Sequence, residues 1–106
     1  MAGALINVPR SVKRGQVFEV KVLMSHPMET GYRPGTNGSI IPRNIIQTFR
    51  VTYGDGEVFR MEMSPAVAAN PFVSFFARAG ESGPMVFTWS GDNGFSAKES
   101  AQIQVE

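Results

Sequence analysis

The chain has 106 residues, with 10 Lys and Arg against 9 Asp and Glu, for a formal net charge of +1. This balance argues against binding of nucleic acid or of an anionic membrane by bulk electrostatic attraction. The chain has no cysteine and a single histidine, which excludes disulfides, thiolate nucleophiles, cysteine-ligated metal centres and sites built from two imidazoles of one chain. The length is that of one domain, which we expect to span residues 1–106.

Alternation of apolar and polar residues predicts β-strands along most of the chain. The segments expected to form strands are, in chain order, 4–8, 18–24, 49–53, 59–63, 72–77, 85–89 and 101–105. A period of two places one set of side chains on one face of a strand, and no helical spacing of similar extent occurs. About seven short strands separated by turns are typical of an immunoglobulin-like (fibronectin-like) all-β sandwich, here without a disulfide.

The residues between these segments fit turns and loops. Gly54-Asp55-Gly56 lies between two predicted strands and supplies the backbone freedom that a tight hairpin requires. Residues 31–42 are too rich in glycine and proline for a strand, so we expect a long loop there. Residues 64–70 are compatible with a single helical turn or with an irregular crossover between sheets.

The predicted strand at 72–77 is apolar on both of its faces. Phe72 and Phe76 share one face, and Val73 and Phe75 share the other. A sandwich strand needs only one apolar face, so one of these sets faces something other than the core of its own domain. A contiguous apolar patch usually marks an interaction site. Coverage of the patch by the long loop is the alternative.

The only histidine, His26, follows a predicted strand and precedes Pro27. Met24, His26 and Met28 are spaced by two, so an extended chain places all three on one side. Thioether and imidazole donors suit a soft cation such as Cu(I), which makes a copper-binding sandwich one hypothesis. The alternative is that Met24 belongs to the core and that His26 forms hydrogen bonds in a turn. Glu29 is placed to orient the imidazole, but no nucleophile or second acid accompanies it, so the sequence does not predict an enzyme.

Several stretches together match the pattern of a known family. They are 20–31 (VKVLMSHPMETG), Ile41-Pro42 with Ile46-Gln47, 70–75 (NPFVSF), and Trp89 with Asp92-Asn93-Gly94. In these stretches, which extend over nearly the whole chain, the sequence resembles the SoxZ family. SoxZ is one subunit of the sulfur-carrier complex SoxYZ of bacterial thiosulfate oxidation. The most specific part of the resemblance is 23–31 (LMSHPMETG).

The resemblance implies a fold for this chain and different roles for the two subunits of the complex. It implies an immunoglobulin-like sandwich, in agreement with the strand pattern, and a SoxY partner with a cysteine on a glycine-rich C-terminal arm. Sulfur intermediates are carried on that cysteine while other sulfur-oxidation enzymes act on them. Because the present chain has no cysteine, we expect it to be a non-catalytic scaffold without a cofactor.

We therefore predict a heterodimer with a SoxY-like subunit, and transient contacts with other sulfur-oxidation enzymes. The predicted partner-binding residues are Met24, His26, Pro27, Met28, Glu29, Phe72, Val73 and Phe75, with Phe76 as a further candidate. The residues around His26 are expected to order a loop used in assembly or in docking the arm of the partner. We expect the isolated chain to form a homodimer through the same apolar surface.

The expected compartment depends on which observation is used. Residues 1–8 contain no basic residue and no apolar run as long as a secretory signal requires, which alone suggests a cytoplasmic protein or an already trimmed one. The resemblance instead implies the periplasm, because SoxZ-like chains lack a signal peptide and are exported bound to a partner that has one. No apolar run reaches the ~18 residues of a membrane span.

Overall fold

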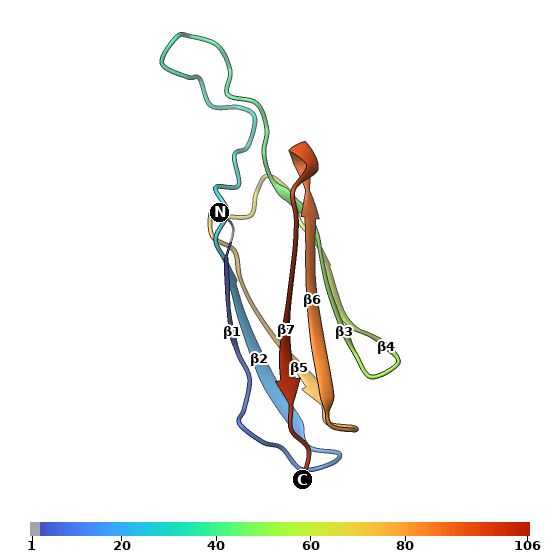
Figure 1. The fold of residues 1–106 in the computed structure, drawn as a ribbon. Coiled ribbons are helices and arrows are strands. Elements are labelled where there is room, and N and C mark those ends of the chain that lie inside the picture. Colours follow the sequence, from blue (N-terminus) through green and yellow to red (C-terminus); the bar gives the residue numbers. More distant parts are fainter. Residues whose placement is uncertain (1–2) are drawn as a thin grey trace.

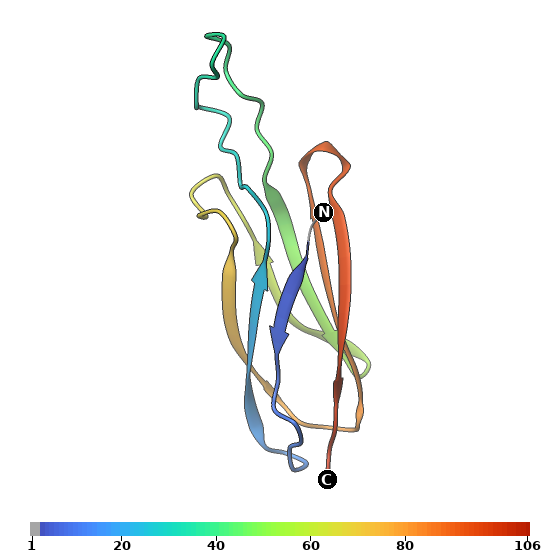
Figure 2. The same cartoon turned by 60° about the vertical axis from the view of Figure 1, so that its left-hand side comes forward.

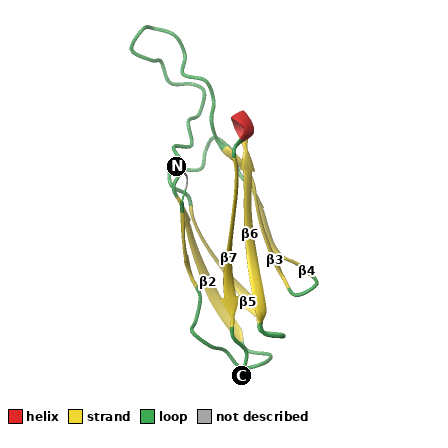
Figure 3. Ribbon diagram, viewed as in Figure 1, coloured by secondary structure: helices red, strands yellow, loops and turns green. Residues whose placement is uncertain are grey.

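The computed structural model describes residues 3–106 and shows two antiparallel β-sheets packed face to face (Figures 1 and 3). The elements are β1 (Ala4–Asn7), β2 (Val17–Met24), β3 (Ile46–Tyr53), β4 (Gly56–Glu62), β5 (Phe72–Arg78), β6 (Gly83–Gly91), the 3-10 turn η1 (Asp92–Gly94) and β7 (Ser96–Ile103). The small sheet has the strand order β1-β2-β5, and the large sheet has the order β4-β3-β6-β7. The predicted all-β sandwich is confirmed. In the described residues no helix has the length and hydropathy needed to cross a membrane.

The last strand differs from its prediction. β7 begins at Ser96 and ends at Ile103, whereas alternation predicts a strand at 101–105. β7 pairs with β6 along its whole length, so backbone hydrogen bonds rather than apolar side chains determine where it begins. Because β7 is an edge strand, most of its residues are exposed and its first half needs no apolar alternation. Val105 lies beyond the strand and pairs only with Val12, in an isolated bridge.

The two segments that do not fit the strand pattern have different structures. Residues 64–70 contain no helix and carry the chain from β4 in the large sheet to β5 in the small sheet, which is the crossover alternative. Residues 31–42 form the outer part of a narrow arm that extends beyond the sandwich (Figure 1). The two legs of the arm are paired, since the Ile41 N–H donates to the Arg33 carbonyl oxygen at 2.8 Å. The arm accounts for part of the elongated shape, whose extents are 58 × 21 × 19 Å.

Inward-facing side chains of both sheets form one apolar core. Phe49 of β3 is fully buried and stacks on Trp89 of β6, with ring centroids 5.0 Å apart. Phe75 of β5 packs across the sandwich against Phe59 of β4, with ring centroids 4.5 Å apart. Such aromatic contacts add to the stabilisation that comes from burying apolar area. The contact between Phe75 and Phe59 also connects the two sheets directly.

The structure distinguishes the two apolar faces of β5. The exposed fraction is 62% for Phe72 and 67% for Phe76, but only 5% for Phe75. Val73 is half-buried and packs against the core. The placement of Phe75 on a partner surface is therefore corrected: Phe75 belongs to the core, because its ring fills the space against Phe59.

Gly91 lies where β6 crosses the start of β3 at very close range. A Cβ atom at this position would overlap the Ile45 carbonyl oxygen and lie 2.9 Å from the Ile46 Cα atom. We expect Gly91→Ala to lower the free energy of unfolding by about 1–3 kcal/mol, because neither backbone atom can move without disturbing the sheet. Urea denaturation measures this change.

Gly83 provides the matched control on the same strand. A Cβ atom at Gly83 meets nothing within 4 Å, so Gly83→Ala is expected to change stability by no more than about 0.5 kcal/mol. Equal stability of the two variants would contradict the close contact at Gly91.

Candidate functional site

Much of the exposed apolar surface lies on the outer face of the small sheet. The large apolar residues that are exposed are Leu5, Val17, Tyr32, Ile40, Val58, Phe72 and Phe76. Tyr32 and Ile40 belong to the arm and Val58 to the large sheet, and the others lie on the outer face of the small sheet. This face therefore has apolar area available for contact with another molecule.

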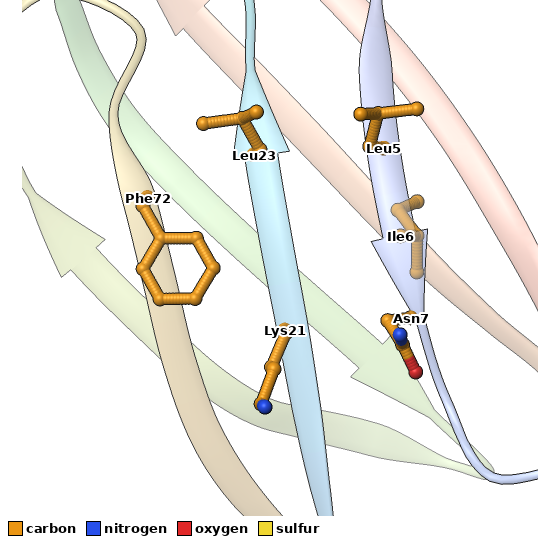
Figure 4. A pocket seen from close by; sticks show the side chains of 6 residues that line it. All are labelled: Leu5, Ile6, Asn7, Lys21, Leu23 and Phe72. Carbon is orange, nitrogen blue, oxygen red and sulfur yellow. The ribbon is translucent and has the colours of Figure 1, made fainter.

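Leu5, Leu23 and Phe72 form a row across the three strands of the small sheet, which we call the apolar row. The strand register places Leu5 of β1 opposite Leu23 of β2, and Leu23 opposite Phe72 of β5. Figure 4 shows Leu23 between the other two side chains, with Lys21 and Asn7 further along the same face. These residues line a shallow groove of about 440 Å³.

The apolar row arises where the alternation of β2 changes. The outward residues Glu19 and Lys21 are polar, but the next outward residue is Leu23. Phe76 lies opposite Glu19, whose Oε2 accepts a hydrogen bond from the Ser74 hydroxyl at 2.6 Å. The outer face is thus most apolar at the end of β2 from which the arm leaves.

Sequence reasoning identified Phe72 and Phe76 but missed Leu5 and Leu23. A signal for Leu23 exists, because it lies in the apolar run Val22-Leu23-Met24, which a strand cannot bury on one face. The position of Leu5 follows only from the pairing of β1 with β2, which the sequence pattern does not predict.

His26 lies where β2 ends and the arm begins, and its backbone N–H and its ring Nδ1 are both hydrogen-bonded within the chain. Its N–H donates to Asn70 Oδ1 at 3.0 Å, and its Nδ1 accepts a hydrogen bond from the Met28 N–H at 3.0 Å. The ring packs edge-on against Phe95, with ring centroids 4.7 Å apart. Because Nδ1 is an acceptor, the neutral imidazole carries its proton on Nε2. Burial lowers the pKa of His26 below its ordinary value of 6.5, and the Asp92 carboxylate opposes this effect only in part.

Met24, His26 and Met28 are all buried, which agrees with the prediction that they lie on one side of the chain. Two of the candidate metal-ligating atoms are engaged, because the Met28 Sδ accepts a hydrogen bond from the Ile46 N–H at 3.3 Å and the His26 Nδ1 accepts one from the Met28 N–H. Binding of Cu(I) through the Met28 sulfur or through Nδ1 would break these contacts, so the geometry favours the turn role of His26 over the copper hypothesis. Within residues 3–106, no three His, Cys, Asp or Glu side chains form a group that could hold a metal ion.

Pro27 and Met28 turn the chain out of the sheet. Pro27 is exposed, and Met28 has a φ of 48°, in the left-handed region that non-glycine residues rarely adopt. The next residue, Glu29, pairs with Asn44 on the other leg of the arm through N–H···O bonds of 2.7 and 2.8 Å. The Glu29 carboxylate accepts two hydrogen bonds from the Arg33 guanidinium, which lowers the pKa of Glu29.

Asp92 of η1 holds the second leg of the arm, a role that sequence reasoning missed. Its carboxylate accepts two hydrogen bonds of 2.8 Å from Arg43, one of 3.1 Å from the Ile45 N–H and one of 2.6 Å from Gln47 Nε2. The hydrogen bonds from Arg43 are the main reason that the pKa of Asp92 lies below its usual range. No local sequence motif indicates this role, because Asp92 is far from Arg43 in the sequence.

These contacts together form what we call the arm base. Its members are His26, Pro27, Met28, Glu29, Arg43, Asn44, Asn70 and Asp92. The arm base can position the arm relative to the sandwich, and the apolar row offers a surface for contact with another molecule.

The fold places the chain among the immunoglobulin-like β-sandwiches, and the sequence assigns it to a family. The model of the family described as "Sulphur oxidation protein SoxZ" matches residues 6–102. The chain belongs to the SoxZ family and thus to the sulfur oxidation system. No protein with a curated description matches the chain significantly.

Solved structures share the fold at low sequence identity. The sulfur carrier protein SoxY from Chlorobium limicola f thiosulfatophilum superposes with a TM-score of 0.68 at 15% identity, covering 97% of this chain and 78% of SoxY. A superoxide reductase (neelaredoxin) from Ignicoccus hospitalis superposes with a TM-score of 0.75 at 22% identity, covering 97% of this chain and 80% of the reductase. At these identities the similarity shows the fold alone.

The pKa of His26 makes the stability of the chain depend on pH. Because this pKa is lower in the folded than in the unfolded chain, the unfolded state binds more protons below about pH 6.5. The contribution of His26 is therefore complete above about pH 6.5 and is lost as the pH falls below that value. We expect His26→Asn, which keeps an acceptor for the Met28 N–H but does not titrate, to lose less stability than the native chain between about pH 7 and pH 5.

Urea denaturation at the two pH values measures the difference. Carboxylates that titrate in this range contribute to both proteins and cancel in the comparison. An identical loss of stability in the two proteins would show that His26 is not responsible.

Proposed function

We propose that this chain is a non-catalytic subunit of a SoxYZ sulfur carrier and that it holds a SoxY-like subunit in a heterodimer. The C-terminal cysteine of the SoxY-like subunit carries the sulfur intermediate, and the present chain acts as its scaffold. The observation that carries the proposal is the apolar row of Leu5, Leu23 and Phe72, of which Leu5 and Phe72 are exposed, on a domain of the SoxZ family.

The composition of the chain supports a binding role rather than a catalytic one. Covalent carriage of sulfur needs a nucleophilic thiolate, and the 106 residues include no cysteine. The single imidazole is buried and its Nδ1 accepts the Met28 N–H, so it is poorly placed to act as a general base. A reactive group must therefore come from another polypeptide.

The outer face of the small sheet has the properties of a protein-binding surface. The exposed fraction is 72% for Leu5 and 62% for Phe72, so both side chains have apolar area to bury. Burial of a side chain of this size in a complex is worth about 1.5–3 kcal/mol. Exposed aromatic residues such as Phe72 and Phe76 are also of the kind enriched in protein interfaces.

The arm base contributes mainly by shaping the arm. His26 and Met28 are buried, so they act by holding the backbone, whereas Pro27 is exposed and Glu29 is partly exposed, so these two can contact a partner directly. The arm projects away from both sheets (Figure 2), where it is accessible to other sulfur-oxidation enzymes that dock transiently on the assembled carrier.

Two substitutions on the apolar row test the proposed contact. We expect Leu5→Asp and Phe72→Asp each to weaken binding of a SoxY-like subunit at least about tenfold, because each buries an unpaired charge in the interface. Isothermal titration calorimetry with the purified SoxY-like subunit measures the dissociation constants.

Val58→Asp is the matched control, since Val58 is also an exposed apolar residue but lies on β4 of the large sheet. It is expected to bind like the native chain. If Leu5→Asp and Phe72→Asp both bind with native affinity, the SoxY-like subunit does not bind the outer face of the small sheet.

The proposed compartment is the periplasm, which this chain reaches by export together with its partner. Membership of the SoxZ family supports this location. Cell fractionation is expected to find the chain in the periplasm when it is co-expressed with its partner. It should remain in the cytoplasm when the signal peptide of the partner is deleted, and export without that signal would contradict the proposed route.

A further inference from the structure

Among the edge strands of the sandwich, β5 has the least protection against pairing with another chain. The sheet orders leave β1 and β5 at the edges of the small sheet, and β4 and β7 at the edges of the large sheet. Edges are commonly protected by shortness or by charged side chains, because their free N–H and C=O groups readily pair with another strand. β1 has only 4 residues. The charged residues of the large-sheet edges are Glu57, Arg60 and Glu62 on β4 and Lys98 and Glu99 on β7.

In contrast, β5 has 7 residues and reads FVSFFAR, with its only charge at the last position. It borders the small sheet on the left in Figure 2, and within residues 3–106 its only strand partner is β2. Neither shortness nor charge therefore protects this edge along most of its length.

The register shows which backbone groups of β5 face the open edge. The Met24 N–H donates to the Pro71 carbonyl oxygen at 3.1 Å, so these opposite residues form a hydrogen-bonded pair. In an antiparallel ladder hydrogen-bonded and non-hydrogen-bonded pairs alternate. The N–H and C=O groups of Phe72, Ser74 and Phe76 consequently point away from β2, toward the open edge.

We propose that β5 pairs in antiparallel fashion with β5 of a second copy of this chain, with Ser74 opposite Ser74 of the second copy. In this register Phe72 of each copy lies opposite Phe76 of the other. With the two-fold axis at Ser74, the contact between Phe72 and Phe76 occurs twice, once on each side of the axis. The pairing joins the two small sheets into one continuous sheet and brings the exposed phenylalanine rings together across the strands.

Other registers match these side chains less well. Moving the two-fold axis to Val73 or Phe75 places Ser74 opposite a phenylalanine. Moving it to Phe76 leaves Phe72 opposite a residue outside β5. The register centred on Ser74 pairs each exposed phenylalanine with another one, which is why a second copy fits this edge.

Edge pairing and the contact proposed for the SoxY-like subunit share Phe72 but differ in their other groups. Edge pairing uses the free backbone groups of β5, whereas the apolar row extends across the sheet to Leu5 on the opposite edge strand. Leu5→Asp is therefore expected to leave edge pairing intact, so that failure of one contact does not imply failure of the other.

Charges placed at position 74 test the register. Ser74 lies opposite Lys21 and forms a hydrogen bond with Glu19, so either charge meets one attractive and one repulsive neighbour within the same chain. In the proposed dimer, however, position 74 faces itself. We expect the native chain to approach twice its mass of 11.6 kDa with rising concentration in sedimentation equilibrium. Ser74→Lys and Ser74→Asp should each remain monomeric, and an equimolar mixture of the two should recover the dimer.

Gln102→Lys adds the same charge to an exposed position on β7 and is the matched control, expected to dimerise like the native chain. Amide hydrogen exchange gives a second measurement. Protection of Phe72, Ser74 and Phe76 should rise with concentration, whereas Phe75 should be protected at every concentration.

Three results would overturn the inference. The native chain could remain monomeric at every concentration, or it could self-associate equally well with either charge at Ser74. Alternatively, protection of the alternate β5 amides could occur only after addition of a SoxY-like subunit, which would assign this edge to the heterodimer instead of a second copy.

Discussion

Burial of one face of each sheet against the other holds this protein together. Phe49 of the large sheet and Phe75 of the small sheet lie within this contact, each against an aromatic ring. Because side chains alternate along a strand, the same contact determines which residues remain outside. On the large sheet the outward residues are mainly polar or charged, whereas on the small sheet they include Leu5, Leu23 and Phe72. The two outer faces of the sandwich are therefore chemically different.

The end of the sandwich that carries the arm depends on polar contacts more than on apolar area. A neutral imidazole at His26 and an ionised carboxylate at Asp92 each accept hydrogen bonds from backbone N–H groups. Where the chain exits a sheet, some backbone N–H groups have no partner in the sheet, and these acceptors provide one. The arm is tied to the sandwich at both of its legs, through Met28, whose Sδ accepts the Ile46 N–H of β3, and through Arg43, which donates to Asp92.

The chain belongs to a family of the sulfur oxidation system and yet has no thiol. SoxY, described as a sulfur carrier protein, has a similar two-sheet fold at 15% identity. The fold alone therefore does not distinguish a carrier from a scaffold. A reactive side chain makes that distinction, and in its absence the proposed role depends on the outer face of the small sheet and on the arm.

The sequence by itself determined the sandwich, because the alternation of apolar and polar residues can be recognised within each strand without knowledge of its neighbours. It also identified the family, through residues such as His26 and Pro27. Only the tertiary structure decided which face of β5 is buried, since both faces are apolar and the choice follows from the contact of Phe75 with Phe59. The role of His26 was decided in the same way. Spacing predicted its side of the chain, but its hydrogen bonds depend on the turn at Met28 and on Asn70, which is distant in sequence.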